Sequence, residues 1–565
     1  MISPESANTK NRIWLVLETN WAALVWLLFG VVVVLRLVNL SKIPISENEA
    51  ELALIAARIA KGHAGMVSEL PLYTGLSAIL FFVFGDSEFW LRILPIIAGC
   101  SLVFIPALWR DRLDFDKVFL LSLALAVIPT VTYYSRTIDS PIFAISALIW
   151  LISLLRRRSW MWAGVAAACL WLSGSLALPI TILVILGYFL IKSQNNNTTH
   201  YVLGLGSDKA GFNRFCSAMA IALVVISTSF LLNITGLGGL GSFFTSTARN
   251  FENWTPTELA RSAFLLLHYN LIPLILFFWG WIKQWRSTKE PKQAHSLYLI
   301  LATVCLVFSL INPKFQLPFS LLVWIMGISA LGRNQELFEQ KRNIYLPLVV
   351  FGIALLVYVS IVAKTWSNAP YNGLALGLAA IAGVILFILA HGFVGLGWST
   401  SVAKQAAFTS IGVILVIGTL AGNFRFVLAE PKIAALQWQN TPVFTRTILP
   451  ALVSEFQALS NFKQGELNLK VETNPTAPYE WMTRDLTNLR ALPKSNMPGI
   501  IITSSDKPGN QIESNYRGMS IATSEAINWT NLNLKQFVVG ILGMELPVIK
   551  QFNYLWVEKS FFTGN

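Results

Sequence analysis

The stretch SKIPISENEAELALIAARIAKGHAG (Ser41–Gly65) decides how this sequence is interpreted, because it directly follows residues 14–40, which are almost wholly apolar. An α-helix needs about 20 apolar residues to cross a membrane, and this run is longer. Glu47, Glu49 and Glu51 then occur within one short turn of chain. The sequence therefore predicts a membrane span that ends in an acidic segment at one membrane face.

Composition extends this interpretation to most of the chain. Its 565 residues are 55% hydrophobic and 13% charged, with a mean hydropathy of +0.59, which is too apolar for an ordinary soluble protein. The pattern predicts an all-α polytopic membrane domain over residues 1–427 with about 13 transmembrane helices and outer-face interfacial helices in 41–89. The predicted spans are 14–40, 90–109, 118–134, 141–155, 159–173, 175–191, 216–234, 262–282, 296–311, 315–332, 344–363, 372–395 and 405–427. The apolar stretch 70–84 is shorter and contains Pro and Gly, so we expect it to be re-entrant or interfacial.

Positive charge predicts the orientation, because cytoplasmic loops retain Lys and Arg. With the N-terminus inside, the inside loops hold far more Lys and Arg than the short outside loops. The bias predicts a cytoplasmic N-terminus and an outside C-terminus. It also accounts for the net charge of +13, so we expect membrane lipids and no nucleic acid as partners.

Residues 428–565 have an ordinary composition and predict a small extracytoplasmic α/β domain. A helical pattern covers 442–462, and strand-like runs cover 465–473, 498–505, 516–524 and 536–549. Tyr479, Trp481 and Arg484 lie close together in this domain. Their rings either stack on an acceptor sugar or, as we favour, pack beneath a helix.

The acidic segment offers the first candidate site. From Glu49 onward the spacing of apolar residues fits a helix along the membrane surface, with Arg58 facing water or lipid phosphate. An acid beside basic groups can take a proton from an acceptor while the cations hold an anionic lipid leaving group. We therefore predict Glu49, and after it Glu47, as the general base, and Arg58 as a ligand of the lipid phosphate.

Two further stretches place ionisable groups on the same membrane face. In VTYYSRTIDSPIFA (131–144), Arg136 and Asp139 follow a span; Asp139 is either a partner acid or a helix N-cap. In LINPKFQLPFS (310–320), Lys314 occupies a tight turn between two spans, where it either binds phosphate or anchors the span ends by snorkelling. In the functional alternative, Asp139 is the partner acid, and Arg136 and Lys314 are further phosphate ligands; the structural alternatives for Asp139 and Lys314 stay open at this point.

Other motifs are left out of the site. GLGGLG (236–241) fits a dinucleotide-binding pattern, but it follows a membrane span rather than a strand and is interpreted as a chance match. In GDSEFWLR (85–92), Asp86 or Ser87 is expected to cap a helix, and Glu88 and Arg92 are expected to pair at i, i+4. The cysteines and histidines are scattered, so no structural metal site is expected.

Taken in order, these stretches resemble the polytopic C-type (GT-C) glycosyltransferases, the superfamily of protein O-mannosyltransferases and lipid A aminoarabinose transferases. The resemblance is specifically to the RgtA/B/C/D-like or dolichyl-phosphate-mannose-protein mannosyltransferase-like branch, and it covers roughly residues 14–335. It rests on the first span with its acidic helix, then LPLYTGLSAILFFVFGDSEFWLR (70–92), IPTVTYYSRTID (128–139) and SLINPKFQLP (309–318).

The resemblance implies an inverting transfer of a sugar from a polyprenyl-phosphate-linked donor to a lipid, glycan or protein acceptor, outside a bacterial plasma membrane. A loop acid acts as the base in that family, and the lipid phosphate leaves. The family's Asp-Glu pair falls on Asn48 and Glu49, so an amide stands at the first position, and Glu47 or Glu49 is expected to substitute for it. A divalent Mg²⁺ or Mn²⁺ beside the acids is compatible with oxygen ligands, although the sequence offers no direct support for it.

Two alternative functions stay open. A transporter or flippase places ionisable groups within the membrane and often shows paired halves, whereas these spans are nearly free of acids and show no repeat. A non-catalytic scaffold in cell-envelope polysaccharide assembly would account directly for Asn48.

Overall fold

The structure is a computed structural model. It describes residues 21–424 except 64, 112, 195–208, 253–254, 287–292, 331–341 and 369–372. Beyond residue 424 it describes 427–428, 431–439, 442–444, 449, 451–452, 454–456, 458, 469–473, 476–484, 499–504, 515–541, 546–559 and 562.

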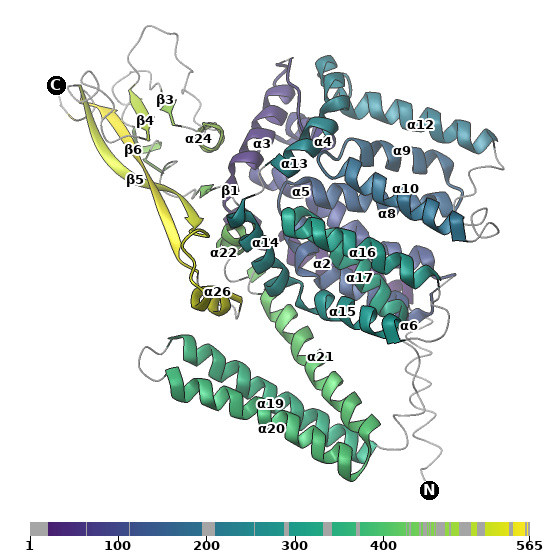
Figure 1. Ribbon diagram of the computed structural model, residues 1–565. Helices are drawn as coiled ribbons and strands as arrows, with labels where there is room; N and C mark the ends of the chain where they lie inside the picture. Colours follow the sequence, from purple (N-terminus) through teal and green to yellow (C-terminus); the bar gives the residue numbers. More distant parts are fainter. Residues whose placement is uncertain are drawn as a thin grey trace.

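Residues up to 424 form a bundle of helices, and Figure 1 shows many of the long ones running side by side. In chain order the elements are α2 (Trp21–Leu37), η1 (Leu40–Lys42), α3 (Glu47–Ala60), α4 (Pro71–Phe84), α5 (Glu88–Ser101), η2 (Leu102–Trp109), α6 (Phe115–Val127), α7 (Pro129–Tyr134), α8 (Ser140–Arg156), α9 (Trp160–Trp171), α10 (Ala177–Gln194), α12 (Lys209–Ser227), η3 (Ile234–Gly241), α13 (Ser242–Glu252), α14 (Pro256–Tyr269), α15 (Leu271–Arg286), α16 (Gln293–Ile311), η4 (Pro313–Phe315), α17 (Gln316–Ala330), α19 (Arg342–Asn368), α20 (Gly373–Gly397) and α21 (Thr400–Phe424).

Most of the predicted spans overlap these helices where the structure describes them. The predicted span 118–134 is divided between α6 and α7, and the predicted span 216–234 extends beyond the end of α12 into a turn. Within the described residues, five helices are long and apolar enough to cross a membrane. They are Glu88–Trp109, Lys209–Ser227, Asn343–Ala363, Ala375–Gly397 and Thr400–Phe424. Most of the other predicted spans form shorter apolar helices, so the count of about thirteen spans is not confirmed by helix length. The stretch predicted as re-entrant or interfacial is α4, whose 14 residues give a length of only about 21 Å.

The predicted span 262–282 is wrong as a single straight helix. The chain bends by 87° between Pro256–Tyr269 and Leu271–Ile282, and up to six spans result if this pair counts as one. The bend lies at Asn270, a buried residue whose side-chain Nδ2 donates to the Oε1 of Gln316 at 3.1 Å. A buried amide with a partner in another helix holds the kink in place.

The C-terminal part forms a six-stranded sheet of order β1-β2-β5-β6-β4-β3. The strands are β1 (Ile45–Ser46), β2 (Val443–Phe444), β3 (Leu469–Glu472), β4 (Ile500–Thr503), β5 (Tyr516–Ile527) and β6 (Val548–Glu558). Only the β3–β4 pair is parallel. Strand β1 comes from the predicted membrane domain and pairs with β2, with Ile45 opposite Phe444. The sheet is therefore joined directly to the residues that precede α3, as Figure 1 shows.

Two predictions for this domain need correction. The run 536–549 was expected to be one strand, but it contains helix α26 (Leu534–Ile541) followed by the start of β6. Asn533 and Gln536 exchange backbone-to-side-chain hydrogen bonds at 2.8 and 3.1 Å, which is a capping-box signal for a helix start. In the predicted helix 442–462, residues 443–444 instead form β2, and much of the remainder lies outside the described residues.

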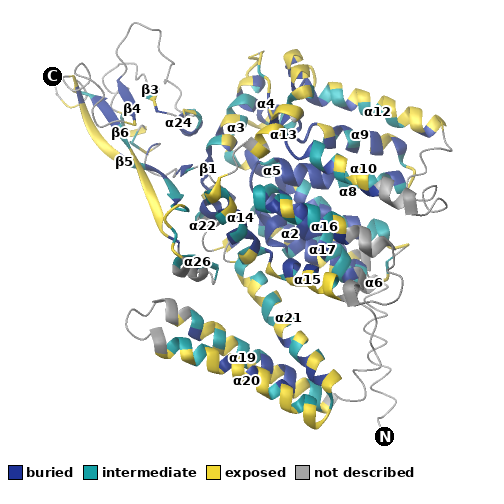
Figure 2. Cartoon of the chain, viewed as in Figure 1, coloured by how far each residue is buried: buried dark blue, intermediate teal, exposed yellow. Residues whose placement is uncertain are grey.

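One hydrophobic core runs through both parts of the chain. It includes Tyr73 of α4 and Ile142 of α8 together with Phe444 of β2 and Trp481 of helix α24 (Ala477–Thr483). Figure 2 shows buried residues concentrated in the main bundle and many exposed residues on α19 and α20. The C-terminal sheet is thus packed against one face of the bundle, and this face carries the site described next.

Candidate active site

Helix α3 begins with a capping box that fixes the acidic segment. The side-chain hydroxyl of Ser46 accepts from the backbone N–H of Glu49 at 3.3 Å, and the Glu49 carboxylate accepts from the Ser46 N–H at 3.2 Å. The Ser-x-x-Glu spacing of the sequence specifies this arrangement. Because Ser46 also belongs to β1, the C-terminal sheet and the start of α3 are locked together.

Glu49 is buried and holds two segments together. Its side chain is only 2% exposed. Besides the Ser46 contact, Oε1 accepts from the backbone N–H of Ile138 at 2.9 Å, and Oε2 lies 3.3 Å from Nη2 of Arg92. Three donors therefore hold this carboxylate. The carboxylate connects the acidic segment to the loop that carries Asp139. Its charge therefore has a structural role.

Arg92 is the buried partner that completes this connection. Its guanidinium donates to the backbone carbonyls of Leu40, Ile43 and Pro44 at 2.9–3.1 Å. These carbonyls lie in the turn between α2 and α3, so Arg92 satisfies backbone groups that have no helical partner. The expected i, i+4 partner of Arg92 was Glu88, but its guanidinium is instead turned inward to Glu49 and the three carbonyls. Ser87 caps α5 as predicted.

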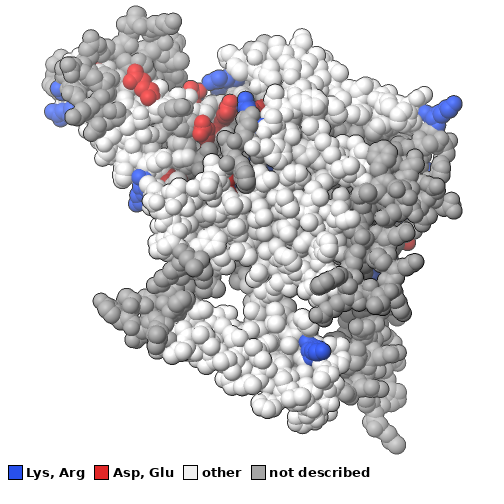
Figure 3. Space-filling view, in the orientation of Figure 1, with Lys and Arg blue, Asp and Glu red and all other residues white. Residues whose placement is uncertain are grey.

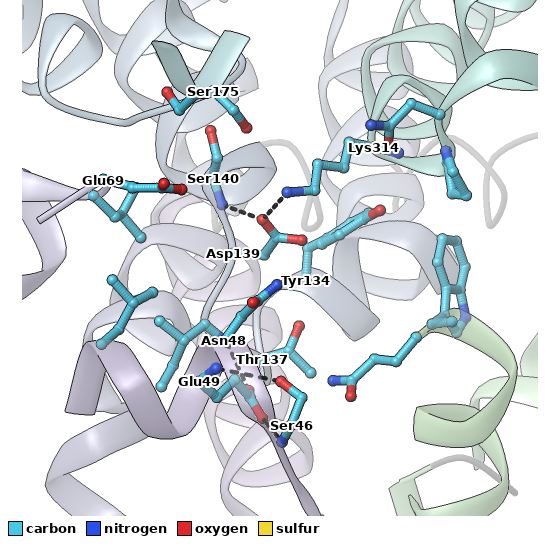
Figure 4. Close-up of a pocket in the computed structure, with 18 of the residues that line it drawn as sticks. Ser46, Asn48, Glu49, Glu69, Tyr134, Thr137, Asp139, Ser140, Ser175 and Lys314 are labelled. Atoms are coloured by element: carbon cyan, nitrogen blue, oxygen red, sulfur yellow. Dashed lines mark hydrogen bonds and ion pairs between the residues drawn. The ribbon is translucent and has the colours of Figure 1, made fainter. Parts of the chain in front are cut away.

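Asp139 and Lys314 form a second acid–base pair nearby. Asp139 is the N-cap of α8 and accepts from the Ser140 N–H at 2.7 Å, and its Oδ1 lies 2.9 Å from Nζ of Lys314. Lys314 projects from the short turn η4, whose start is capped by the side chain of Asn312. Figure 4 shows Asp139 and Lys314 pointing toward each other from two different elements. The N-cap interpretation of Asp139 is thus confirmed, and its role as a partner acid stays a prediction.

These groups line a cavity of about 440 Å³. Its walls include Asn48, Glu49 and Glu51 from α3, Asp139 from the α7–α8 loop and Lys314 from η4. Figure 4 shows Glu49 beside Ser46, and Glu49 is almost completely buried. Figure 3 shows red acidic atoms gathered between the C-terminal domain and the helices. The cavity is therefore a polar pocket at one face of an otherwise apolar bundle.

Two more ion pairs in the pocket wall were not predicted from the sequence. Arg249 of α13 pairs with Glu69, and Arg261 of α14 pairs with Glu258 at 2.5 Å. All four side chains line the pocket. The charge pattern already placed both arginines on the same membrane face as Asp139, but nothing in their spacing indicated that separate helices would bring them together.

The C-terminal chain forms part of the pocket wall. Trp438, at the end of helix α22 (Pro431–Trp438), stacks on Tyr133 with ring centroids 4.7 Å apart. The backbone carbonyl of Trp438 accepts from Nη1 of Arg261 at 2.8 Å, and Gln439 also faces the pocket. The sequence predicted a separate outer domain and gave no sign of this contribution.

The remaining predicted site residues do not line the pocket. Glu47 is half-buried outside it, where burial and the charge of Glu51 raise the pKa of its carboxyl group. Arg58 pairs with Glu480 at 2.8 Å on the protein surface. Arg136 is buried and donates to the carbonyl of Val38 at 2.5 Å. The predicted phosphate roles of Arg58 and Arg136 thus have no support from their positions.

The aromatic group of the C-terminal domain packs as favoured. Tyr479 and Trp481 are buried, and the guanidinium of Arg484 lies 3.7 Å from the centre of the Trp481 ring. Arg484 also donates to the carbonyl of Asp86. These residues fasten α24 to the start of α5 rather than forming a sugar platform.

Among the described residues, no group of three or more His, Cys, Asp or Glu side chains is arranged to hold a metal ion. The Mg²⁺ or Mn²⁺ with which oxygen ligands are compatible therefore has no ready-made set of protein ligands in this part of the chain.

Comparison with known proteins decides the fold. No protein-family model matches the sequence, and no curated protein sequence matches it either. Among solved structures, ArnT from Cupriavidus metallidurans bound to undecaprenyl phosphate matches with a TM-score of 0.52 and 12% identity, over 98% of this chain and 99% of that one. ArnT is a GT-C glycosyltransferase. This chain has the GT-C fold.

The apo state of the same ArnT aligns over 97% of this chain and 100% of that chain, with 14% identity and a TM-score of 0.49. The match to the undecaprenyl-phosphate-bound structure confirms the GT-C fold predicted from the ordered motifs, over 98% of this chain. At this level of identity the likeness concerns the fold, and the chemistry of the pocket has to be argued from its own residues.

Proposed function

We propose that this protein is a membrane glycosyltransferase that moves a sugar from a polyprenyl-phosphate-linked donor to a hydroxyl group of a lipid, glycan or protein acceptor. The observation that carries the proposal is the Asp139–Lys314 pair in a polar pocket at one face of the bundle. A carboxylate and a cation side by side are the two groups that this reaction requires. Support from the fold comes from ArnT, which has been crystallised with undecaprenyl phosphate.

In the proposed reaction the acceptor oxygen attacks the anomeric carbon of the donor sugar. Its proton passes to Asp139, the new glycosidic bond forms, and the bond from the anomeric carbon to the phosphate oxygen breaks. The electron pair of that bond leaves with the lipid phosphate, whose charge Lys314 and Arg249 stabilise. Attack opposite the leaving group inverts the anomeric configuration.

Asp139 suits the base role better than Glu49. Asp139 is about one-third exposed and faces the pocket, whereas Glu49 is engaged by three donors and nearly inaccessible. Lys314 carries three N–H donors, so it can contact Asp139 and a phosphate oxygen at once. Asn48 lines the same pocket and can donate a hydrogen bond, but its amide cannot serve as a base.

We further propose that the pocket opens on the outer side of a bacterial plasma membrane, with the N-terminus in the cytoplasm. The excess of Lys and Arg in the opposite loops supports this orientation. A donor linked to a lipid carrier suits such a location, because no nucleotide sugar is needed there.

The test is transfer of radiolabelled sugar from polyprenyl-phosphate donors by the purified full-length protein in liposomes. Wild type should transfer the label and invert the anomeric configuration, and Asp139→Asn should lower turnover by about 10²–10⁴-fold. Addition of a chelator, then of Mg²⁺ or Mn²⁺, tests the metal prediction in the same assay.

A non-catalytic scaffold is the second candidate, and Asn48 is the observation that favours it. A scaffold should show no transfer with any donor, and its assembly role should tolerate Asp139→Asn. Transfer by wild type that is lost in Asp139→Asn would exclude it.

A further inference from the structure

We propose that residues 228–241 form a lipid-binding lip, in which Phe230, Leu231 and Ile234 insert among the acyl chains of the leaflet that borders the pocket. This segment contains the GLGGLG motif, which the proposed reaction does not use. Direct lipid contact by the lip does not depend on catalysis. Its effect on substrate use, described last, rests on the proposed function.

The backbone of the lip is unusual. Ser229, Phe230 and Leu231 have φ values of 50°, 58° and 72°, so three consecutive residues other than glycine adopt the left-handed conformation. This conformation is strained for a residue with a Cβ atom, because the Cβ crowds the following carbonyl oxygen. Hydrogen bonds from the Phe230 N–H to the Val225 carbonyl at 2.8 Å and from the Leu231 N–H to the Thr228 hydroxyl at 3.2 Å hold the turn.

This costly turn displays apolar side chains. Phe230, Leu231 and Ile234 are 50%, 71% and 69% exposed. They follow α12, whose 19 residues give a helix of about 28 Å, close to the thickness of a bilayer core. The turn therefore lies where the membrane interior meets the headgroups. Exposure of these apolar side chains to water is unfavourable in free energy. Insertion among lipid acyl chains takes the same apolar surface out of water.

The lip is also fastened to the rim of the pocket. The side-chain Nδ2 of Asn233 donates to the Met66 carbonyl at 2.7 Å, and the Gly65 N–H donates to the Thr235 hydroxyl at 3.1 Å. The next residues along the chain, including Val67 and Glu69, line the pocket. Movement of the lip would thus move the rim.

The glycine motif permits this close packing. A Cβ atom at Gly236 would lie 2.0 Å from the backbone carbonyl oxygen of Ser227, and one at Gly239 would lie 3.0 Å from Cγ of Pro71. The glycines that resemble a nucleotide-binding motif therefore allow close packing of the backbone. This packing presses the lip against α12 on one side and the start of α4 on the other. We infer that the lip sets the pocket rim at the depth of the lipid phosphates.

The direct test places a bimane fluorophore on Leu231→Cys, in full-length protein that also carries Cys216→Ser and Cys169→Ser. The protein is reconstituted in phosphatidylethanolamine–phosphatidylglycerol vesicles with doxyl-labelled lipid. Asn531→Cys, an exposed position in the C-terminal domain, is the aqueous control. Strong quenching at 231 with little at 531 is expected. Equal, weak quenching at both positions would overturn the proposal whether or not the protein is an enzyme.

The functional test compares Leu231→Glu with Leu396→Glu. Leu396 is 87% exposed near the C-terminal end of α20, which the predicted topology places at the opposite membrane face from the pocket. A charge in the lip should raise the KM for a long-chain donor about tenfold, since each CH₂ removed from lipid costs about 0.8 kcal/mol. It should leave the KM for a short-chain, water-soluble donor unchanged, and Leu396→Glu should affect neither. Equal effects of Leu231→Glu on both donors would contradict the membrane role.

Phe230→Gly separates the side chain from the backbone. Glycine adopts the left-handed conformation without strain, so the turn should persist while one apolar contact is lost. Weaker quenching of a label at Ile234→Cys in this variant, with an unchanged unfolding temperature, is expected. A lower unfolding temperature would show that Phe230 packs in the fold rather than in lipid.

Discussion

The pairs Lys314–Asp139 and Arg92–Glu49 use the same kinds of charge on the same face of the bundle, yet they are built for different purposes. Nζ of Lys314 lies 2.9 Å from Asp139, with side chains 28% and 31% exposed. Nη2 of Arg92 lies 3.3 Å from Glu49, with side chains 1% and 2% exposed. The first pair faces a cavity, and the second joins the acidic turn to the α7–α8 loop.

The difference shows what burial does to an acid–base pair. A buried pair with all its neighbours in place cannot exchange partners, and removal of one member leaves an uncompensated charge. A half-exposed pair can release its cation to a phosphate and its carboxylate to a hydroxyl group. The buried Arg92–Glu49 pair therefore contributes to stability and the more exposed Lys314–Asp139 pair to chemistry. Each variant below tests that division.

The largest effect on stability is expected for Arg92→Ala. The substitution removes the cation paired with the buried Glu49 carboxylate, together with the Arg92 donors to three backbone carbonyls, so the free energy of unfolding should fall by about 3–5 kcal/mol. Thermal unfolding in detergent measures the loss. Arg92→Lys keeps the charge and should recover part of the stability. If Arg92→Ala unfolded at the wild-type temperature, the buried pair would not contribute to stability as the comparison requires.

Lys314→Ala should act on transfer instead. Hydrogen bonds to a charged group contribute about 1.5–3 kcal/mol, so turnover should fall roughly 10–10²-fold if Lys314 stabilises the leaving phosphate. The unfolding temperature should stay unchanged, because the pair is half-exposed, and Lys314→Arg should retain part of the activity. A lowered unfolding temperature with normal turnover in the folded fraction would make Lys314 a structural residue.

A smaller change is expected for Arg249→Ala at the pocket rim. Its partner Glu69 is solvated, so the loss of the pair should scarcely alter stability. The KM for the polyprenyl-phosphate donor should rise about tenfold, which corresponds to one weakened phosphate contact. Glu69→Gln is the matched control and should leave that KM near its wild-type value. A higher KM in both variants would assign the effect to the ion pair itself.

The smallest effect is expected for Arg58→Ala. Its ion pair with Glu480 is exposed and should contribute less than about 1 kcal/mol to stability. Because Arg58 does not line the pocket, donor KM and turnover should stay at wild-type values. A large rise in the donor KM of Arg58→Ala would support the phosphate-binding role that the sequence predicted for Arg58.

Much of the fold could be predicted from the sequence, because membrane spans are set by local apolar runs. Most of the predicted spans overlap helices in the described part, and the ordered motifs indicated the GT-C fold. The break at Asn270 and strand β1 escaped prediction because both depend on contacts with distant segments.

The site was only partly predictable for a related reason. The charge pattern placed Glu49, Asp139 and Lys314 on one membrane face, and all three line the pocket. The charge pattern carried no information on depth, so Glu49 was ranked above Asp139, and the inward contacts of Arg92 with Glu49 and the backbone were not predicted. Trp438 was missed because the C-terminal chain folds back on the membrane helices from outside the compared motifs.

The most direct test of the central claim compares Asp139→Asn with Glu49→Gln in one preparation, with turnover and unfolding temperature measured for both. The account predicts that Asp139→Asn loses turnover by about 10²-fold or more and unfolds like wild type. It predicts that Glu49→Gln unfolds at a lower temperature and that its folded fraction still transfers sugar. A stable, inactive Glu49→Gln beside an active Asp139→Asn would contradict it.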